Sequence, residues 1–221
     1  MVVGSWFSLS RRAISKFVYR QFSVKSVKSR QNVCIALEKG FEEIEAITVA
    51  NILRRACIDV KLMASSVQNS DIIQGSKQIN VETDYGIMDA LLDNNFDLIV
   101  LPGGMTAIRR MIENVHLKKQ VRNHVIGKNG LIGAICGAPL VLAHYGLLTG
   151  YSVTCHPFVK DELLGLGVCK HIIDERVCID RNIITSQGPG TALEFAFTIL
   201  EQFQSEEKVQ ALKKDMMVLR K

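Results

Sequence analysis

LIGAICGAP, residues 131–139, is the most informative stretch of the sequence, because it predicts a buried strand that runs through a short turn into a helix. Leu131–Ile135 is an apolar run of the length typical of a strand covered on both faces. Pro139 stands where the first turn of a helix tolerates proline, so residues 138–146 are predicted to be helical. Cys136 therefore lies on a turn at the carboxyl end of a strand, the edge of an open α/β sheet at which ligands bind.

The alternation of strand and helix extends in both directions from this stretch. Asn32–Leu37 and Ile58–Ala64 are apolar, β-branched runs that predict strands. Glu42–Cys57 lies between them and carries apolar residues three and four apart, as an amphipathic helix does. Phe96–Leu101 predicts another buried strand, which stops at the turn Pro102-Gly103-Gly104.

The remaining elements complete a single domain. Residues 65–75 are polar and rich in turn formers. Further helices are expected at 105–114, 116–127, 157–164, 192–203 and 206–219, and short strands at 78–81, 152–155, 176–179 and 182–186. Together these elements predict one α/β domain over residues 31–221, built on a mostly parallel, doubly wound sheet.

Basic residues are concentrated at the start of the chain. The sequence has 27 Lys and Arg against 22 Asp and Glu, and residues 1–30 hold seven of the basic residues, seven serines and no acid. Trp6, Leu9, Ala13 and Phe17 recur there at helical spacing. This composition is typical of an organelle transit peptide, with a membrane-surface helix or a basic tail as alternatives.

The segment Arg20-Gln21-Phe22-Ser23 is similar to a mitochondrial processing site, so the mitochondrion is the predicted location and the cytoplasm the alternative. The rest of the chain is almost neutral, which gives no electrostatic basis for binding nucleic acid. It also lacks the run of about 20 apolar residues that a membrane span requires.

The six cysteines show no CxxC pair, which favours free thiols in a reducing compartment. The set most similar to a metal site matches no zinc-binding spacing, so neither a metal nor another cofactor is predicted. That set is Cys155, His156, Cys169, His171 and Cys178.

Cys136 is the candidate nucleophile. The start of the following helix favours a thiolate, and the amide of Gly137 is placed to hold an oxyanion. Gly103 and Gly104 end a second strand at the same sheet edge and are candidates to complete that oxyanion site. Taken alone, the cysteine is also compatible with an inert core residue, and the glycines with a plain tight turn.

Glu45 and His156 are the candidate partners of the thiol. Glu45 lies in the first turns of the helix after the first strand, whereas Glu42 and Glu43 are expected to be solvated. His156 follows a short strand and precedes Pro157, on a loop able to reach the sulfur. The other histidines, His116, His124, His144 and His171, are expected at the surface.

Five blocks, NVCIALEKGFEEIEAI, IVLPGG, LIGAICGAP, VTCHP and ITSQGPGTALEFA, occur in this order and together resemble the ThiJ/PfpI superfamily. The chain is most similar to its parkinsonism-associated deglycase branch, DJ-one, over about residues 32–219. The resemblance implies a flavodoxin-like three-layer sandwich that usually forms a homodimer.

The resemblance also implies roles for individual residues. Cys136 takes the place of the nucleophile, with Glu45 as a protonated carboxyl partner and His156 as the active-site histidine. The backbone of Gly104 and Gly137 takes the place of the oxyanion hole. Arg55 matches an arginine that approaches the partner subunit's site.

The activities implied are cofactor-independent conversion of methylglyoxal or glyoxal to a hydroxy acid, and deglycation of early adducts on proteins. Small aldehydes and glycated proteins are therefore the expected partners. The alternatives are a redox-sensing, chaperone-like protein that acts through oxidation of Cys136 and, by analogy of fold alone, a cysteine hydrolase. The chain departs from the branch at Gly137, where alanine is common, and at Gln187 and Lys77, where arginine is usual.

Overall fold

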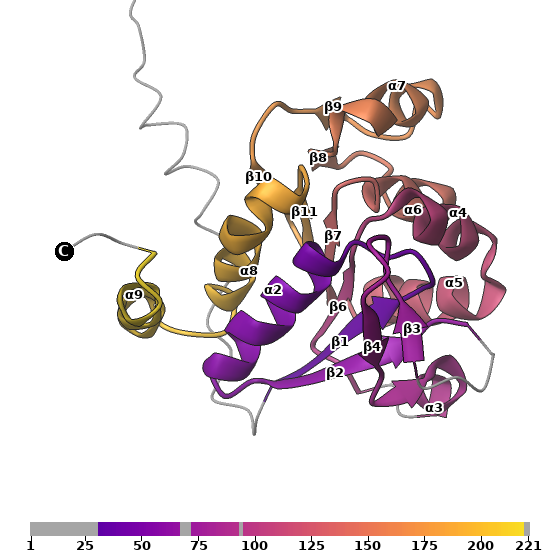
Figure 1. Ribbon diagram of the computed structural model, residues 1–221. Helices are drawn as coiled ribbons and strands as arrows, with labels where there is room; N and C mark the ends of the chain where they lie inside the picture. The colour runs from indigo at the N-terminus through magenta and orange to yellow at the C-terminus, as the bar shows by residue number, and fades with distance from the viewer. Residues whose placement is uncertain (1–30, 67–71, 93–94, 219–221) are drawn as a thin grey trace, which may run out of the picture.

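The computed structural model describes residues 31–66, 72–92 and 95–218 (Figure 1). The predicted transit peptide lies outside these residues. The first strand β1 (Asn32–Leu37), helix α2 (Glu43–Arg55) and strand β2 (Asp59–Ala64) form the predicted βαβ unit. β1 and β2 are parallel, with Asn32 opposite Asp59 and Leu37 opposite Ala64.

In the described residues, seven strands form the central sheet, in the order β10-β11-β7-β6-β1-β2-β5. All neighbouring pairs are parallel except β10 and β11, which confirms a mostly parallel sheet. The strands not yet given are β5 (Tyr85–Gly86), β6 (Leu98–Leu101), β7 (Leu131–Ile135), β10 (Val177–Asp180) and β11 (Ile183–Ser186). The chain builds outward from β1 through β2 to one edge and then from β6 to the other, so the order reverses between β1 and β6. This reversal is where α/β sheets open a crevice beyond the carboxyl ends of their strands.

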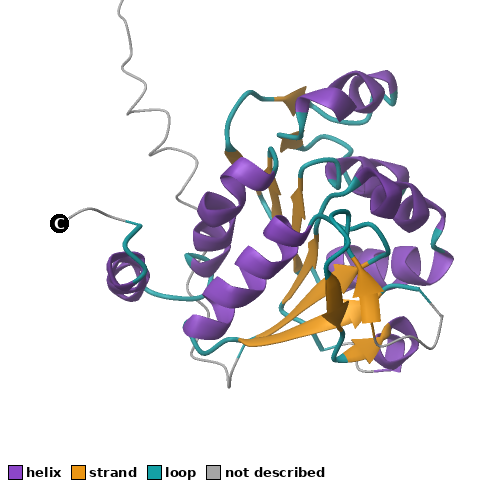
Figure 2. Ribbon diagram, in the orientation of Figure 1, coloured by secondary structure: helices purple, strands orange, loops and turns teal. Residues whose placement is uncertain are grey.

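Helices cover both faces of the sheet, giving the expected three layers (Figure 2). α2 packs beside α8 (Ala192–Leu200) on one face, and α9 (Glu206–Asp215) follows α8. The helices of the other face are α4 (Met105–Glu113), α5 (Val115–Arg122) and α6 (Pro139–His144), with α3 (Ile87–Leu92) near the β5 edge and α7 (Pro157–Gly165) beyond α6.

β1 shows how the sheet divides the core. Val33, Ile35 and Leu37 belong to the apolar cluster that contains the α2 and α8 side chains. Cys34 and Ala36 belong to the cluster on the α4, α5 and α6 side. Because successive side chains of a strand point to opposite faces, a strand buried on both faces must be apolar at every position, as this one is.

Within the part of the chain that the structure describes, two short strand pairs lie outside the central sheet. β3 (Ile72–Gln74) and β4 (Asn80–Glu82) form an antiparallel hairpin, and β8 (Ser152–Val153) pairs in parallel with β9 (His171–Ile172). The strands predicted near 78–81 and 152–155 therefore exist but do not join the main sheet. In the part of the chain that the structure describes, no helix is both long and apolar enough to cross a membrane.

The helix predicted over residues 116–127 changes its winding near its end. After Arg122 it continues as a π-helix, η1 (Asn123–Gly127). This turns His124 inward, where it is 1% exposed and its Nε2 lies 2.7 Å from the carbonyl oxygen of Leu131. The expectation that His124 is a surface residue is therefore wrong.

Candidate active site

Cys136 lies on a strained turn directly after β7 and before α6. Its φ is 65°, a left-handed conformation that a residue with a side chain rarely adopts. Two backbone hydrogen bonds hold this turn in place. The Cys136 amide donates to the carbonyl oxygen of Ser186 at 2.9 Å, and its own carbonyl accepts from the amide of His156 at 2.8 Å. The ends of β7 and β11 and the start of α7 are thereby tied together at the cysteine.

Glu45 is fully buried in the first turn of α2, beside this cysteine. Its Oε2 accepts a hydrogen bond from the Gly103 amide at 2.7 Å. Its Oε1 is buried without a hydrogen bond of ordinary geometry, and the Cys136 thiol lies close enough to interact with the carboxyl group. The structure therefore brings the predicted thiol and carboxyl together.

Gly103 separates these two side chains. A Cβ placed on it would lie 2.6 Å from the Cβ of Cys136, 3.0 Å from its sulfur, and 2.7 Å from Oε2 of Glu45. These distances are too short for carbon, so only glycine fits between the two groups. The Gly-Gly turn after β6 is thus required for the approach of the thiol and carboxyl, in addition to any role of its amides.

The amides of Gly104 and Gly137 both point toward the Cys136 sulfur, where they act to lower its pKa. Gly104 has a φ of 97°, and a Cβ on it would stand 2.1 Å from the carbonyl oxygen of Gly40. A Cβ on Gly137 would stand 2.5 Å from Cδ1 of Ile108. Alanine at position 137 therefore requires the end of the Ile108 side chain to move.

Burial governs the protonation of the pair. It raises the pKa of Glu45 to about 7 against the opposing hydrogen bond from Gly103. Burial, and then the charge of Glu45, raise the pKa of Cys136 to about 12, although the Gly137 and Gly104 amides act against this. The predicted stabilisation of the Cys136 thiolate by the start of the following helix is therefore present, but burial and the charge of Glu45 raise the pKa by more. Because each negative charge opposes the other, the pair holds one charge far more readily than two.

His156 caps the start of α7. Its Nδ1 accepts a hydrogen bond from the Phe158 amide at 3.3 Å, so the proton of the neutral ring is on Nε2. Burial lowers the pKa of His156, which favours this neutral form. Nδ1 is consequently not available to donate to a carboxylate, as the histidine of a Ser-His-Asp or Cys-His-Asp triad does.

Glu43 contributes to the site in a way that the sequence did not predict. It is 5% exposed, and it accepts hydrogen bonds from the Lys77 amide at 2.6 Å and the Ser76 hydroxyl at 3.0 Å. The expectation that Glu43 is solvated is therefore wrong, because the turn between β3 and β4 folds onto the start of α2 and covers it. The first turn of α2, which carries Glu45, is anchored by this hairpin.

Arg55 lies apart from this site within one chain. It is in the last turn of α2, ten residues beyond Glu45, which corresponds to about 15 Å along a helix. Its Nε donates to Oδ1 of Asn51 at 2.9 Å. It borders a groove of about 420 Å³ formed by residues of α2 and β2, namely Ile47, Ala50, Asn51, Arg54, Arg55 and Leu62.

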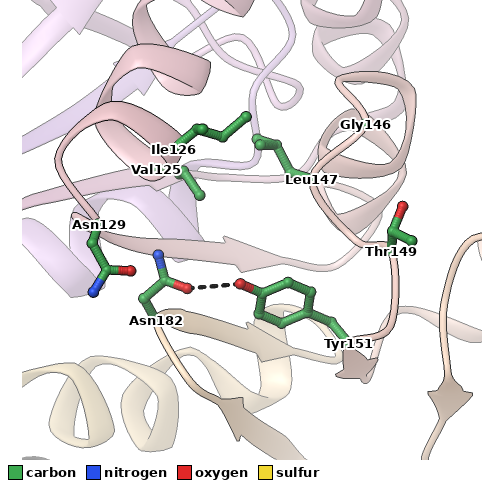
Figure 3. Close-up of a pocket in the computed structure, with 8 residues that line it drawn as sticks. All are labelled: Val125, Ile126, Asn129, Gly146, Leu147, Thr149, Tyr151 and Asn182. Atoms are coloured by element: carbon green, nitrogen blue, oxygen red, sulfur yellow. Dashed lines mark hydrogen bonds between the residues drawn. The ribbon is translucent and has the colours of Figure 1, made fainter.

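A cavity of about 320 Å³ is lined in part by Asn129 and Asn182 (Figure 3), which precede β7 and β11, whereas Cys136 follows the other end of β7. The Tyr151 hydroxyl donates to Oδ1 of Asn182 at 3.0 Å across it. Its lining holds no cysteine or acid, so the chemistry described above does not belong to it.

The model of the DJ-1/PfpI family matches residues 31–202 of this chain. The protein dj-1beta of Drosophila melanogaster is 36% identical over 188 residues, which cover 85% of this chain and 97% of that relative. Its crystal structure has a TM-score of 0.80 at 35% identity, covering 87% of this chain and 100% of that chain.

Two further relatives carry informative names. The Parkinson disease protein 7 homolog of Danio rerio is 33% identical over 184 residues, 83% of this chain and 95% of its own length. The glutathione-independent glyoxalase DJR-1.2 of Caenorhabditis elegans is 35% identical over 178 residues, 79% of this chain and 89% of its own length. The resemblance seen in the sequence and the flavodoxin-like fold are both confirmed, and this chain belongs to the DJ-1/PfpI family.

Proposed function

We propose that this protein is a cofactor-independent glyoxalase that converts methylglyoxal to lactate and glyoxal to glycolate, with Cys136 as its nucleophile. The observation that carries the proposal is the buried carboxyl of Glu45 beside the Cys136 sulfur, with the Gly104 and Gly137 amides directed at the same atom. The activity in the name of the Caenorhabditis elegans relative supports the same chemistry.

The two pKa values place the single negative charge of the resting pair on Glu45, and the reactive state, a thiolate next to a protonated Glu45, forms when the thiol proton passes to that carboxylate. Since the Gly103 amide donates to Oε2, the proton of a neutral Glu45 resides on Oε1, the oxygen without a hydrogen bond of ordinary geometry. From there Glu45 can donate a hydrogen bond to the sulfur of the thiolate. This arrangement removes the carboxylate charge that opposes ionisation of the thiol.

The reaction proceeds through a covalent intermediate. The thiolate adds to the aldehyde carbon and forms a C–S bond, and the resulting alkoxide accepts hydrogen bonds from Gly104 and Gly137 and then the proton of Glu45, which leaves Glu45 as a carboxylate. The proton on that carbon moves to the neighbouring carbon through an enediol, giving a thioester of the hydroxy acid. Water then cleaves the C–S bond, which releases lactate or glycolate and restores the thiol.

We assign the proton transfer between carbons to Glu45. Its pKa of about 7 matches a group that takes up and returns a proton near neutral pH. The neutral His156 carries its proton on Nε2, so it acts as a hydrogen-bond donor to the substrate oxygen. This arrangement argues against a cysteine hydrolase, whose histidine requires an orienting acid at Nδ1.

The same addition to carbon extends to early adducts of these aldehydes on protein thiols and amines. A hemithioacetal or aminocarbinol adduct first breaks its C–S or C–N bond, which frees the protein thiol or amine and the aldehyde, and Cys136 then adds to that aldehyde carbon. Protection of proteins against glycation then follows from the glyoxalase chemistry.

The test is lactate formation from methylglyoxal by wild type, Cys136→Ser and Cys155→Ser. Cys155 is a matched control because it is also buried and lies two residues beyond β8. Lactate from wild type and Cys155→Ser but not from Cys136→Ser supports the proposal. Lactate at equal rates from all three proteins contradicts it.

A second candidate function, peroxide sensing by Cys136, is favoured by the same two amides. Oxidation to a sulfinate would place new anionic oxygens where Gly104 and Gly137 donate. Oxidation to a sulfinate consumes two peroxide molecules, so peptide mass spectrometry after two equivalents of peroxide tests it, with selective oxidation of Cys136 as the supporting result. Oxidation of the exposed Cys57 in preference to Cys136 would reject this function.

We also propose that α2 packs against a second copy of the chain. Ile44 and Ile47 on α2 are 56% and 40% exposed, next to the groove that Arg55 borders. Light scattering should give twice the mass of the chain, and Ile47→Glu should give a monomer. Ile126→Glu is the control, because Ile126 is 60% exposed on a different surface. A monomeric wild type rejects the dimer.

Import into mitochondria is proposed from residues 1–30, which precede the part of the chain that the family model matches. Fusing residues 1–30 to a fluorescent protein should direct it to mitochondria, and exchanging Arg11 and Arg12 for glutamate should prevent this. Cytoplasmic fluorescence of the unmodified fusion would favour the alternative location.

A further inference from the structure

Phe158 is a large apolar residue that stays exposed beside the candidate active site. It is in the first turn of α7, two residues after His156, and it is 55% exposed. Single exposed apolar residues are common on protein surfaces and need no explanation by themselves. This ring, however, packs on the His156 ring, with 4.1 Å between the centroids and 51° between the planes.

The first turn of α7 lies directly over the strained turn of Cys136. The amide of His156 donates to the carbonyl of Cys136 at 2.8 Å. Val159, the residue after Phe158, is fully buried, and its Cγ1 lies 3.3 Å from where a Cβ on Gly137 would stand. Phe158 therefore lies between His156 and Val159, which both contact the turn, while its own side chain stays exposed.

The geometry of the site restricts where a substituent of the substrate can go. When the sulfur is bonded to the aldehyde carbon, Gly103 and the fully buried Glu45 occupy the inner side. The substituent on the ketone carbon must then extend away from Gly103 and Glu45. Phe158 offers an exposed apolar ring on the first turn of α7, which contacts the Cys136 turn through the backbone of His156.

We propose that Phe158 is a specificity-determining residue that favours 2-oxoaldehydes with a planar, apolar substituent, such as aryl glyoxals, over methylglyoxal. This inference rests on the proposed function. An aromatic ring that packs edge-on or offset against Phe158 gains a contact that a methyl group cannot make. Contacts of this kind correspond to roughly a 3- to 10-fold difference in kcat/KM.

The experiment compares kcat/KM for phenylglyoxal and methylglyoxal in the full chain and in Phe158→Leu and Phe158→Ala. Both variants keep the backbone amide that donates to His156. The ratio of phenylglyoxal to methylglyoxal should fall roughly 3- to 10-fold in Phe158→Ala and by less in Phe158→Leu. Leu164→Ala is the matched control, because Leu164 is 54% exposed on the same helix, and its ratio should equal that of wild type.

A ratio that is the same in wild type and Phe158→Ala, with both aldehydes converted, overturns this inference and leaves the proposed function standing. An equal loss on both aldehydes also overturns it, since that indicates a structural role. If wild type converts neither aldehyde, the proposed function fails. The role of Phe158 is then tested by comparing the rates at which 2-bromoacetophenone and bromoacetone alkylate Cys136. A phenyl preference that disappears in Phe158→Ala then supports Phe158 as the recognition residue, and an unchanged preference overturns it.

Discussion

The amide of Gly103 donates to Glu45 at 2.7 Å, and a Cβ on Gly103 would stand 2.6 Å from the Cβ of Cys136. The thiol and the carboxyl therefore meet across a residue that has no side chain. Both groups lie where parallel strands end beside the reversal of strand order, so the fold itself brings them together.

Gly103→Ala should abolish most of the activity, because the added methyl group overlaps both Cys136 and Glu45. We expect kcat/KM to fall by at least about 100-fold, because even a small misplacement of the reacting groups causes a loss of this size. Gly165→Ala is the control, since nothing lies within 4 Å of a Cβ at that position. Activity of Gly103→Ala close to that of the control would show that the two side chains need not meet.

The buried Glu45 should make the protein less stable as pH rises. Its pKa is raised from 4.5 to about 7, so the folded state holds a proton that the unfolded state loses. The stability that this proton provides is complete below pH 4.5 and is lost as pH rises through about 7. Its size is up to about 3 kcal/mol, at ~1.4 kcal/mol per pKa unit.

Urea denaturation at several pH values measures this effect. The difference in unfolding free energy between Glu45→Gln and wild type should increase between pH 4.5 and pH 7. A difference that does not vary with pH over that range would mean that Glu45 ionises normally in the folded protein.

Glu45→Gln should separate the two roles assigned to the carboxyl group. The amide is neutral, so it removes the charge that raises the pKa of Cys136, but it cannot carry a proton between carbons. Alkylation of Cys136 by iodoacetamide at pH 8 should therefore be faster than in wild type, while lactate formation falls by about 100- to 10,000-fold. Slower alkylation together with full lactate formation would contradict this, because Glu45 would then favour the thiolate and have no role in moving the proton between carbons.

His156→Asn should separate helix capping from catalysis. Asparagine is a good N-cap residue, so this variant should keep the stability of α7, whereas His156→Ala should lose about 1 kcal/mol. Both variants should lose activity, because neither supplies the Nε2 proton. Thermal unfolding and lactate assays on the same samples check this. An active His156→Asn would mean that His156 caps α7 but has no role in catalysis.

Glu43 should show the opposite pH dependence to Glu45. Burial acts to raise its pKa, but hydrogen bonds from its own amide, Lys77, Ser76 and Ile79 outweigh this, and its pKa lies below 4.5. The stability from these bonds is present above pH 4.5 and is lost as pH falls through the lowered pKa. Glu43→Gln should cost about 1–3 kcal/mol at pH 7 and much less at pH 3. An equal cost at both pH values would exclude a role for the charge.

The strand, turn and helix around Cys136 were predictable because the signals are local. Leu131–Ile135 is apolar throughout, and Pro139 marks the start of the helix, so the sequence alone places the cysteine at a sheet edge. Gly103 was predictable as a turn residue. Its role as the spacer between Cys136 and Glu45 was not, because that role depends on how β1, β6 and β7 pair.

The misassigned residues have partners or geometry that no local pattern reveals. Glu43 is buried by a turn 34 residues away, and its position in a first helical turn is equally typical of a solvated acid. His124 lies inside because the chain forms a π-helix after Arg122, in which the backbone hydrogen bonds join residues five apart rather than four. This change of helix type has no clear signature in the sequence. Glu43 was misassigned because a segment distant in sequence covers it, and His124 because its helix changes to a π-helix.

The most direct test of the account is proton NMR of methylglyoxal conversion in ²H₂O by wild type, Cys136→Ser and Cys155→Ser. The account predicts lactate from wild type and Cys155→Ser, with deuterium at C2 because the carboxyl of Glu45 exchanges its proton with solvent, and no lactate from Cys136→Ser. Lactate formed by Cys136→Ser at the wild-type rate would contradict the claim that this cysteine is the nucleophile.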